Sequence, residues 1–164
     1  MSRLFEQACQ AWDDEELETT FKLFREAVAQ GDRSSVLNLG FCYDAGMGTK
    51  KNPRKAMYWY RKAALEYGDL PAYENIALCY VARGDFEQAK RWYSDALRKG
   101  DKSAALGLAK LGLENKVNFF QTEIVDYLQI VIDAKWMVEV CESEQEEACL
   151  LLEQLQAKMK LNGK

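Results

Sequence analysis

Apolar residues recur along this chain with the spacing of one face of an α-helix. Val36, Leu39 and Tyr43 follow one another at intervals of three and four residues, which places them on a single helical stripe. Residues 56–63 form a second stripe, in which alanines lie where a neighbouring helix must come close. These stripes predict amphipathic helices that pack against one another.

The helical pattern repeats within the chain. The run V-L-N-L-G-F-C-Y at 36–43 matches Y-E-N-I-A-L-C-Y at 73–80, and A-M-Y-W-Y-R-K-A at 56–63 matches A-K-R-W-Y-S-D-A at 89–96. Repetition with this period is typical of proteins built from stacked helix pairs. Each unit is therefore predicted to contain two helices.

Capping signals mark the ends of these predicted helices. Gly-Asp follows an amphipathic segment at 31–32, 68–69 and 100–101, and each glycine is expected to be a helix C-cap with positive φ. The second helix of the first unit is predicted to begin at Asn52, which a proline follows. The corresponding helix of the second unit is predicted to begin at Asp85, in a variant of the capping box.

The first unit resembles a Sel-one-like repeat, and the second resembles the related tetratricopeptide repeat (TPR). The residues that carry the first resemblance are Asn38-Leu39-Gly40, Tyr43, Gly46-x-Gly48, Pro53, Ala56, Trp59-Tyr60 and Ala63-Ala64. Those that carry the second are Asn75, Ala77, Tyr80, Gly84-Asp85-Phe86, Ala89, Tyr93 and Ala96. The resemblance implies an all-α fold, a right-handed superhelical solenoid of antiparallel helix pairs with about seven to eight helices.

Residues 1–164 are expected to form a single helical-repeat domain with four parts. The parts are an N-terminal helical hairpin at 1–30, a Sel-one-like repeat at 31–67, a TPR-like repeat at 68–99, and a divergent repeat with C-terminal capping helices at 100–164. The capping helices are predicted at 119–134 and 144–161, the second with Ala148, Leu151, Leu152 and Leu155 on its apolar side.

The connection between the two helices of the first unit first looks like a phosphate-binding loop, because Gly46 and Gly48 precede two lysines. The second unit joins the same two helices with a turn four residues shorter, and no Gly-Lys-Ser/Thr sequence is present. The glycines are therefore interpreted as an inter-helix turn. Lys50 and Lys51 are candidates for contact with a partner.

The composition argues against an enzyme. The 164-residue chain contains no histidine, which removes Ser-His and Cys-His nucleophile pairs and the commonest general base. Its five cysteines form no CxxC pair, so they are interpreted as free thiols buried as small hydrophobic side chains, with no metal site. No cofactor is predicted, and catalysis would have to rest on carboxylates, lysines or tyrosines.

The charge distribution bears on the choice of partner. A net charge of −4 favours neither nucleic acid nor an anionic membrane. No apolar run approaches the roughly 20 residues that span a bilayer, and charge interrupts the N-terminus too early for a secretory signal, so a cytoplasmic location is expected. Two acidic clusters are either docking patches or solvated helix faces: Asp13, Asp14, Glu15 and Glu16 near the start, and Glu144, Glu146 and Glu147 near the end.

The TPR resemblance implies a concave binding surface formed by the first helix of each pair. Asn38 and Asn75 would there bond the backbone or terminal carboxylate of a bound peptide, or else bond only within their own repeat. The other residues expected on or near this face are Phe41, Glu74, Leu78 and Lys110. Gly107 stands where a third asparagine would be, which breaks the pattern of a full carboxylate clamp.

The aromatic residues fall into two groups. Those within the repeat register are predicted to be core: Trp59, Tyr60, Trp92 and Tyr93. Trp12 and Trp136 lie outside the register and are candidates for exposed, functional side chains.

The leading hypothesis is a non-enzymatic protein–protein interaction module. More narrowly, the chain is similar to the short, acidic repeat proteins that bacteria use as immunity proteins, which would bind and neutralise a basic toxin domain. The alternative is a regulatory adaptor or co-chaperone that holds a short peptide in its concave groove. An enzyme is the third hypothesis.

Overall fold

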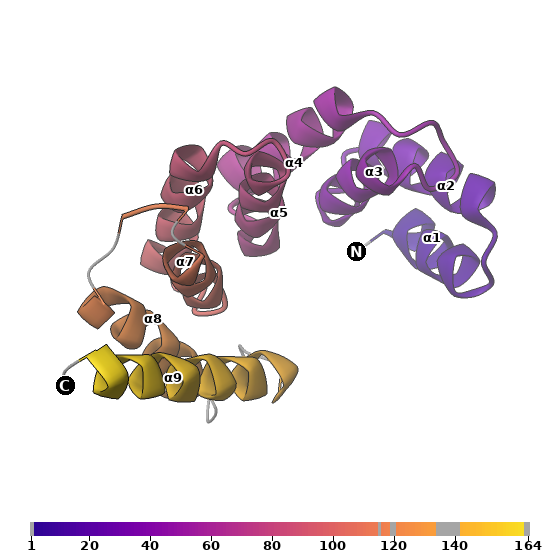
Figure 1. Ribbon diagram of the computed structural model, residues 1–164. Helices are drawn as coiled ribbons and strands as arrows, with labels where there is room; N and C mark the ends of the chain where they lie inside the picture. The colour runs from indigo at the N-terminus through magenta and orange to yellow at the C-terminus, as the bar shows by residue number, and fades with distance from the viewer. Residues whose placement is uncertain (1, 115, 119–120, 134–141, 163–164) are drawn as a thin grey trace. The chain divides into compact units, whose positions relative to one another are not determined.

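The structure, a computed structural model, describes residues 2–114, 116–118, 121–133 and 142–162. These residues form nine α-helices and no strand (Figure 1). The helices are α1 (Arg3–Asp13), α2 (Leu17–Ala29), α3 (Ser34–Ala45), α4 (Pro53–Tyr67), α5 (Leu70–Val81), α6 (Phe86–Arg98), α7 (Ala104–Leu113), α8 (Gln121–Asp133) and α9 (Glu142–Asn162). The predicted all-α class is confirmed. The nine described helices exceed the seven to eight expected.

The chain divides into two compact units, residues 1–79 and 80–164. In the first unit α1 to α4 pack in sequence order, and α1, α2 and α3 share a core of Ala8, Phe21, Phe24, Leu39 and Cys42. In the second unit α7, α8 and α9 share a core that includes Ala105, Leu106, Leu128, Val131 and Ala148. The expected apolar side of the last helix is confirmed, since Leu151, Leu152 and Leu155 also lie in or against this core. The expectation of a single domain stays a prediction.

The predicted helix ends are confirmed. Gly31, Gly68 and Gly100 have φ values of +88°, +69° and +104°. The Asn52 side chain accepts a hydrogen bond from the Lys55 N–H at 3.0 Å, and that of Asp85 accepts one from the Gln88 N–H at 3.3 Å. The helices α4 and α6 therefore begin where a side chain satisfies a backbone N–H of the first turn.

The glycine loop between α3 and α4 is held against another part of the first unit. Gly46 and Gly48 have φ values of +79° and +61°, as an inter-helix turn requires. A Cβ placed on Gly48 would lie 1.9 Å from the carbonyl oxygen of Leu17, at the start of α2. Gly48 therefore provides both a left-handed backbone and room for the loop to lie on α2.

Glycines also let tyrosine rings lie against the backbone of a neighbouring helix. A Cβ on Gly40 would lie 2.7 Å from Cδ1 of Tyr60, and one on Gly107 would lie 2.5 Å from Cε1 of Tyr93. Both tyrosines are buried, which confirms them as core residues, whereas Trp59 and Trp92 are half-buried. The rings thus fix α3 against α4 and α6 against α7.

Asp32 joins the start of α1 to the turn before α3. Its carboxylate accepts hydrogen bonds from the Ser2 hydroxyl and from the backbone N–H groups of Ser2 and Ser34, both at 2.8 Å. Desolvation by burial raises the pKa of Asp32, but these hydrogen bonds outweigh it and leave the pKa below its ordinary value of 3.8. The ionised carboxylate therefore stabilises this corner of the first unit.

The glycine loop gives a first prediction. Gly48→Ala is expected to lower the free energy of unfolding by about 2–5 kcal/mol, because a left-handed alanine costs about 1–2 kcal/mol and overpacking a further 1–3 kcal/mol. Gly68→Ala is the matched control, since Gly68 has the same backbone sign in the same unit but nothing within 4 Å of a Cβ. Its expected cost is only about 1–2 kcal/mol. Equal losses in urea unfolding would contradict the proposed contact with Leu17.

Asp32 gives a second prediction, on pH. Its folded pKa lies below the unfolded value, so its stabilisation is present above about pH 4 and is lost as pH falls through the folded pKa. The Asp32→Ala substitution is expected to lower the free energy of unfolding by about 1 kcal/mol near pH 7. In urea unfolding the difference should narrow toward pH 3. A difference that stays constant between these pH values would show that the charge of Asp32 contributes nothing.

Candidate functional site

Phe41 and Trp12 form an aromatic pair on the surface of the first unit. Their rings are stacked, with centroids 5.4 Å apart and an interplanar angle of 20°. Trp12 also meets Phe24 of the core edge-on at 6.1 Å, while Phe41 remains 38% exposed. Trp12 is half-buried, so it supports the exposed ring of Phe41 from beneath and is not itself an isolated surface residue.

The two predicted asparagines lie on α3 and α5. The Asn38 side chain donates to the carbonyl oxygen of Ser34, one turn earlier in the same helix, at 3.4 Å. This contact agrees with the alternative in which Asn38 forms hydrogen bonds only within its own repeat. Asn75 and Glu74 are half-buried on α5, and Leu78 on the same helix is 49% exposed. These residues belong to the first unit, and their role in binding stays a prediction.

The structure explains why the third asparagine is missing. Gly107 of α7 faces the ring of Tyr93, whose Cε1, Cζ and Cδ1 atoms would all lie within 3 Å of an added Cβ. Any side chain at position 107 would have to displace that buried ring. A clamp of three equivalent asparagines is therefore incompatible with the packing of α6 on α7.

Lys110 of α7 and Glu147 of α9 form an ion pair within the second unit. The Nζ–Oε2 distance is 2.8 Å, and both side chains are more than 40% exposed. The sequence placed these residues on two different candidate surfaces, whereas the structure brings them together. Their pairing reduces the charge that either one presents, although a surface pair of this kind adds little stability.

The four residues Asp13, Asp14, Glu15 and Glu16, here called the acidic corner, join α1 to α2 and are all exposed. Asp13 and Asp14 lie at the C-terminal end of α1, where the helix dipole disfavours negative charge and no basic residue occupies the last turn. Glu15 has a φ of +61°, a value that glycines take elsewhere in the described residues. The corner therefore combines three features that oppose local stability.

The C-terminal acidic residues are less uniform. Glu144 is half-buried and Glu146 is exposed on α9, while Glu147 pairs with Lys110. They belong to the second unit, whereas the acidic corner belongs to the first. Trp136 and Cys141 lie outside the described residues.

The described residues offer little reactive chemistry. Burial raises the pKa of the Cys42 thiol to about 11, which disfavours a thiolate at neutral pH. Burial, followed by the neighbouring Asp44 carboxylate, raises the pKa of Tyr60 as well. Cys149 is exposed, so the expectation that the cysteines are buried is wrong for this residue. The described part of the chain holds no cluster of three potential metal ligands, and none of its helices is long and apolar enough to span a bilayer.

The same repeat register is recognised by comparison with a known family. The model of the Sel1 repeat matches residues 34–66 and 75–101, which contain the α3–α4 pair and most of the next pair. The chain is a Sel1-like repeat protein. Repeats of this family are typical of non-catalytic protein–protein interaction modules.

Two curated relatives are much longer than this chain. An uncharacterized protein of Neisseria meningitidis serogroup B is 31% identical over 113 residues, which are 69% of this chain and 24% of the relative. A Sel1-like repeat-containing protein of Acanthamoeba polyphaga mimivirus is 26% identical over 112 residues, which are 68% of this chain and 21% of the relative. The chain therefore spans less than a quarter of the length of either.

Two solved structures share the fold. A Sel1 repeat protein from Oxalobacter formigenes superposes with a TM-score of 0.63 and 23% identity, covering 84% of this chain and 64% of that one. The protective antigen c5321 of uropathogenic Escherichia coli gives a TM-score of 0.60 and 24% identity, covering 82% of this chain and 33% of that one. These similarities support the helical-solenoid class.

Proposed function

We propose that this Sel1-like repeat protein is a non-catalytic binding module whose acidic corner docks a basic protein. The observation that supports this most strongly is the unfavourable placement of Asp13, Asp14 and Glu15. Residues that oppose local stability and remain exposed are common at functional sites, where a partner compensates for them. A basic partner would neutralise the charge that accumulates at the end of α1.

The more specific proposal is an immunity protein that binds and neutralises a basic toxin domain. Complementary charge increases the rate at which two proteins meet and discriminates against neutral partners. An exposed acidic corner on a chain of net charge −4 suits that purpose. The C-terminal residues Glu144 and Glu146 are a second candidate contact for the same partner.

The third prediction tests the acidic corner. The tagged chain is expected to co-purify with a basic polypeptide at low salt and to lose it as salt rises. Asp13→Lys combined with Asp14→Lys should weaken the affinity for that polypeptide about tenfold or more in calorimetry, since each reversed contact contributes roughly 1 kcal/mol. The same pair should not lower the melting temperature, because lysine suits the C-terminal end of α1.

A matched control separates a local contact from net charge. Glu6→Lys with Glu26→Lys changes the charge by the same amount on exposed residues of the same unit. Docking at the acidic corner would be contradicted if both pairs of substitutions weakened the affinity for the polypeptide equally, or if neither pair weakened it. If the corner binds but co-expression of the chain fails to restore growth in the presence of the polypeptide, the immunity proposal alone would be wrong.

The exposed side chains of α3 and α5 favour a second candidate, a regulatory adaptor or co-chaperone that holds a short peptide. Phe41 is an exposed ring on a rigid aromatic support, and Leu78 is about half exposed. Such side chains can anchor a peptide, while Asn38 and Asn75 bond its backbone.

The fourth prediction tests this peptide-binding face. Phe41→Ala and Asn38→Ala are each expected to weaken the binding of a peptide selected from a display library about tenfold, because anchor contacts contribute more than about 1 kcal/mol. Leu17→Ala is the control, since Leu17 is a comparably exposed apolar residue of the same unit at 44%. If the acidic-corner pair of substitutions weakens the affinity for the peptide more than Phe41→Ala does, the peptide does not bind on α3 and the adaptor proposal is wrong.

A further inference from the structure

Two shallow grooves occupy the same position in successive repeats. One runs along α4 and the other along α6, with volumes of about 370 and 400 Å³. Their lining residues correspond at a constant offset of 33, so that Arg54 matches Glu87 and Leu65 matches Arg98. The offset equals that of the aligned runs 56–63 and 89–96. The two grooves therefore allow two sets of side chains to be compared at equivalent positions of the fold.

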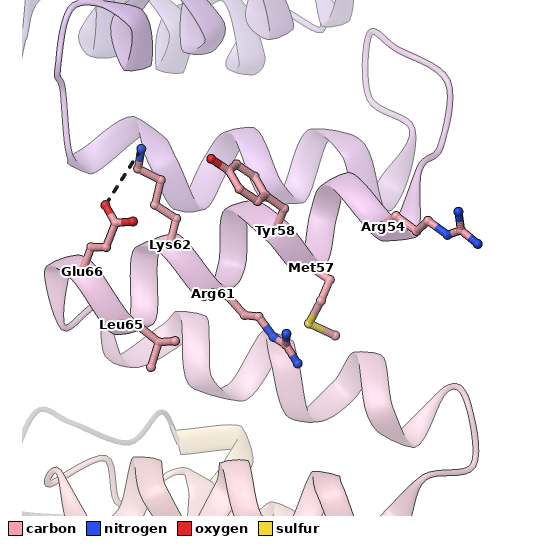
Figure 2. A pocket seen from close by; sticks show the side chains of 7 residues that line it. All are labelled: Arg54, Met57, Tyr58, Arg61, Lys62, Leu65 and Glu66. Carbon is pink, nitrogen blue, oxygen red and sulfur yellow. Dashed lines mark ion pairs between the residues drawn. The ribbon is translucent and has the colours of Figure 1, made fainter.

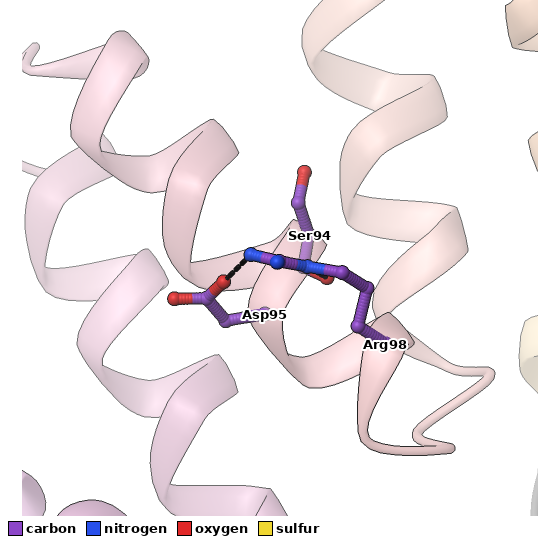
Figure 3. A network of polar contacts seen from close by, with 3 residues as sticks. All are labelled: Ser94, Asp95 and Arg98. Carbon is purple, nitrogen blue, oxygen red and sulfur yellow. Dashed lines mark hydrogen bonds and ion pairs between the residues drawn. The ribbon is translucent and has the colours of Figure 1, made fainter.

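The α6 groove is an ordinary solvated helix surface. Its lining consists of polar and charged residues, with Lys90 and Arg91 near the middle of the helix. Arg98 forms an ion pair with Asp95 and also donates from Nε to the carbonyl oxygen of Ser94 at 3.4 Å (Figure 3). The helix packs correctly with these residues, so the fold does not require apolar side chains at the exposed positions of this groove.

The α4 groove carries apolar residues where α6 carries cations. Met57, Tyr58 and Leu65 replace Lys90, Arg91 and Arg98 at the matching positions. Tyr58 is 58% exposed and Leu65 is 65% exposed. They are seven residues apart, which places them on one side of the helix about 10 Å from each other. Two exposed apolar side chains at this spacing fit the anchors of an amphipathic helix.

Basic side chains surround these apolar positions. Arg54 lies at one end of the groove and the pair of Lys62 and Glu66, 3.9 Å apart, at the other (Figure 2). Residues 50–66 contain six cations against one anion, a net charge of +5 in a chain of −4. The matching segment 83–99 contains five cations against three anions, a net charge of +2. The α4 surface is thus both more apolar and more basic than its counterpart.

We propose that the α4 groove docks an acidic, amphipathic helical segment of a partner protein. Two apolar side chains of the segment, two turns apart, would lie on Tyr58 and Leu65. Its carboxylates would meet Arg54 and Arg61 at the edges of the groove, with Lys50 and Lys51 of the preceding loop adding to the attraction. This surface is distinct from the acidic corner and selects the opposite charge, so it extends the proposed function to a second contact.

The fifth prediction uses a defined probe. The probe is a fluorescein-labelled helical peptide of about 15 residues with two leucines seven residues apart and glutamates around them. Fluorescence anisotropy should detect its binding to the whole chain, with weaker binding at high salt. Arg54→Glu with Arg61→Ser, which installs the residues of α6, should weaken binding about tenfold or more. Tyr58→Ser with Leu65→Ser should do the same without changing the charge.

Controls match each change. Lys90→Ser with Arg91→Glu removes the same charge from α6 and should change affinity less than about twofold. A peptide with lysines in place of glutamates should not compete with the probe for the wild type. Circular dichroism and the melting temperature check folding, which these exposed positions are expected to tolerate because α6 folds with polar residues there.

Three outcomes would overturn the proposal. The first is equal weakening by the α4 and α6 charge variants, which would mean that only net charge matters. The second is unchanged affinity of the probe for the Tyr58→Ser, Leu65→Ser variant, which would show that these two side chains are not anchors. The third is concentration-dependent self-association of the wild type in sedimentation equilibrium, abolished by Arg54→Glu with Arg61→Ser. That result would assign the groove to a second copy of the chain. The first two results do not depend on whether the acidic corner binds a basic partner.

Discussion

The packing of a tyrosine ring against a glycine backbone is the contact on which both units depend. Tyr60 lies on Gly40, and Tyr93 lies on Gly107, at distances that exclude any Cβ. A buried aromatic ring removes about 150–250 Å² from water, but only if the facing helix comes close enough to cover it. The glycine permits that approach, and the ring then fixes the rotation of the helix that carries the glycine. The positions of Asn38 and Phe41 on α3 follow from this contact.

The same core supports different outer surfaces. Residues 56–63 and 89–96 keep their buried alanines and tyrosine, while the residues between them differ in polarity and charge. Close packing restricts the buried positions, whereas substitutions at exposed positions change stability little. The α4 and α6 surfaces could therefore diverge without any change of fold. Because the polar α6 surface occurs in the same protein, it shows that the exposed apolar residues of α4 are not needed for folding.

Local patterns in the sequence predicted the helices, their caps and the repeat register, because these depend on neighbouring residues. The capping roles of Asn52 and Asp85 and the burial of Tyr60 and Tyr93 follow from such patterns. The stacking of Trp12 on Phe41 and the pairing of Lys110 with Glu147 could not be predicted, because their partners are distant in sequence and outside the aligned runs. The exposure of Tyr58 and Leu65 could not be predicted for another reason: the two repeats share their buried residues and differ at their exposed ones, so similarity between the repeats does not mark these two positions.

The acidic corner departs from the local rules that hold at other helix ends of the first unit. At the other helix ends described here, a glycine often takes the left-handed position, as Gly31, Gly68 and Gly100 do. Glu15 takes it instead, after two carboxylates at the unfavourable end of the α1 dipole. A glycine at 15 and a lysine at 13 would satisfy every local rule, and nothing in the packing of the corner prevents them, since all four residues are exposed. Within the chain, the Gln10 side-chain amide donates to both carboxylate oxygens of Asp14 at 3.2 Å. The carboxylates of Asp13, Glu15 and Glu16 would attract a basic surface.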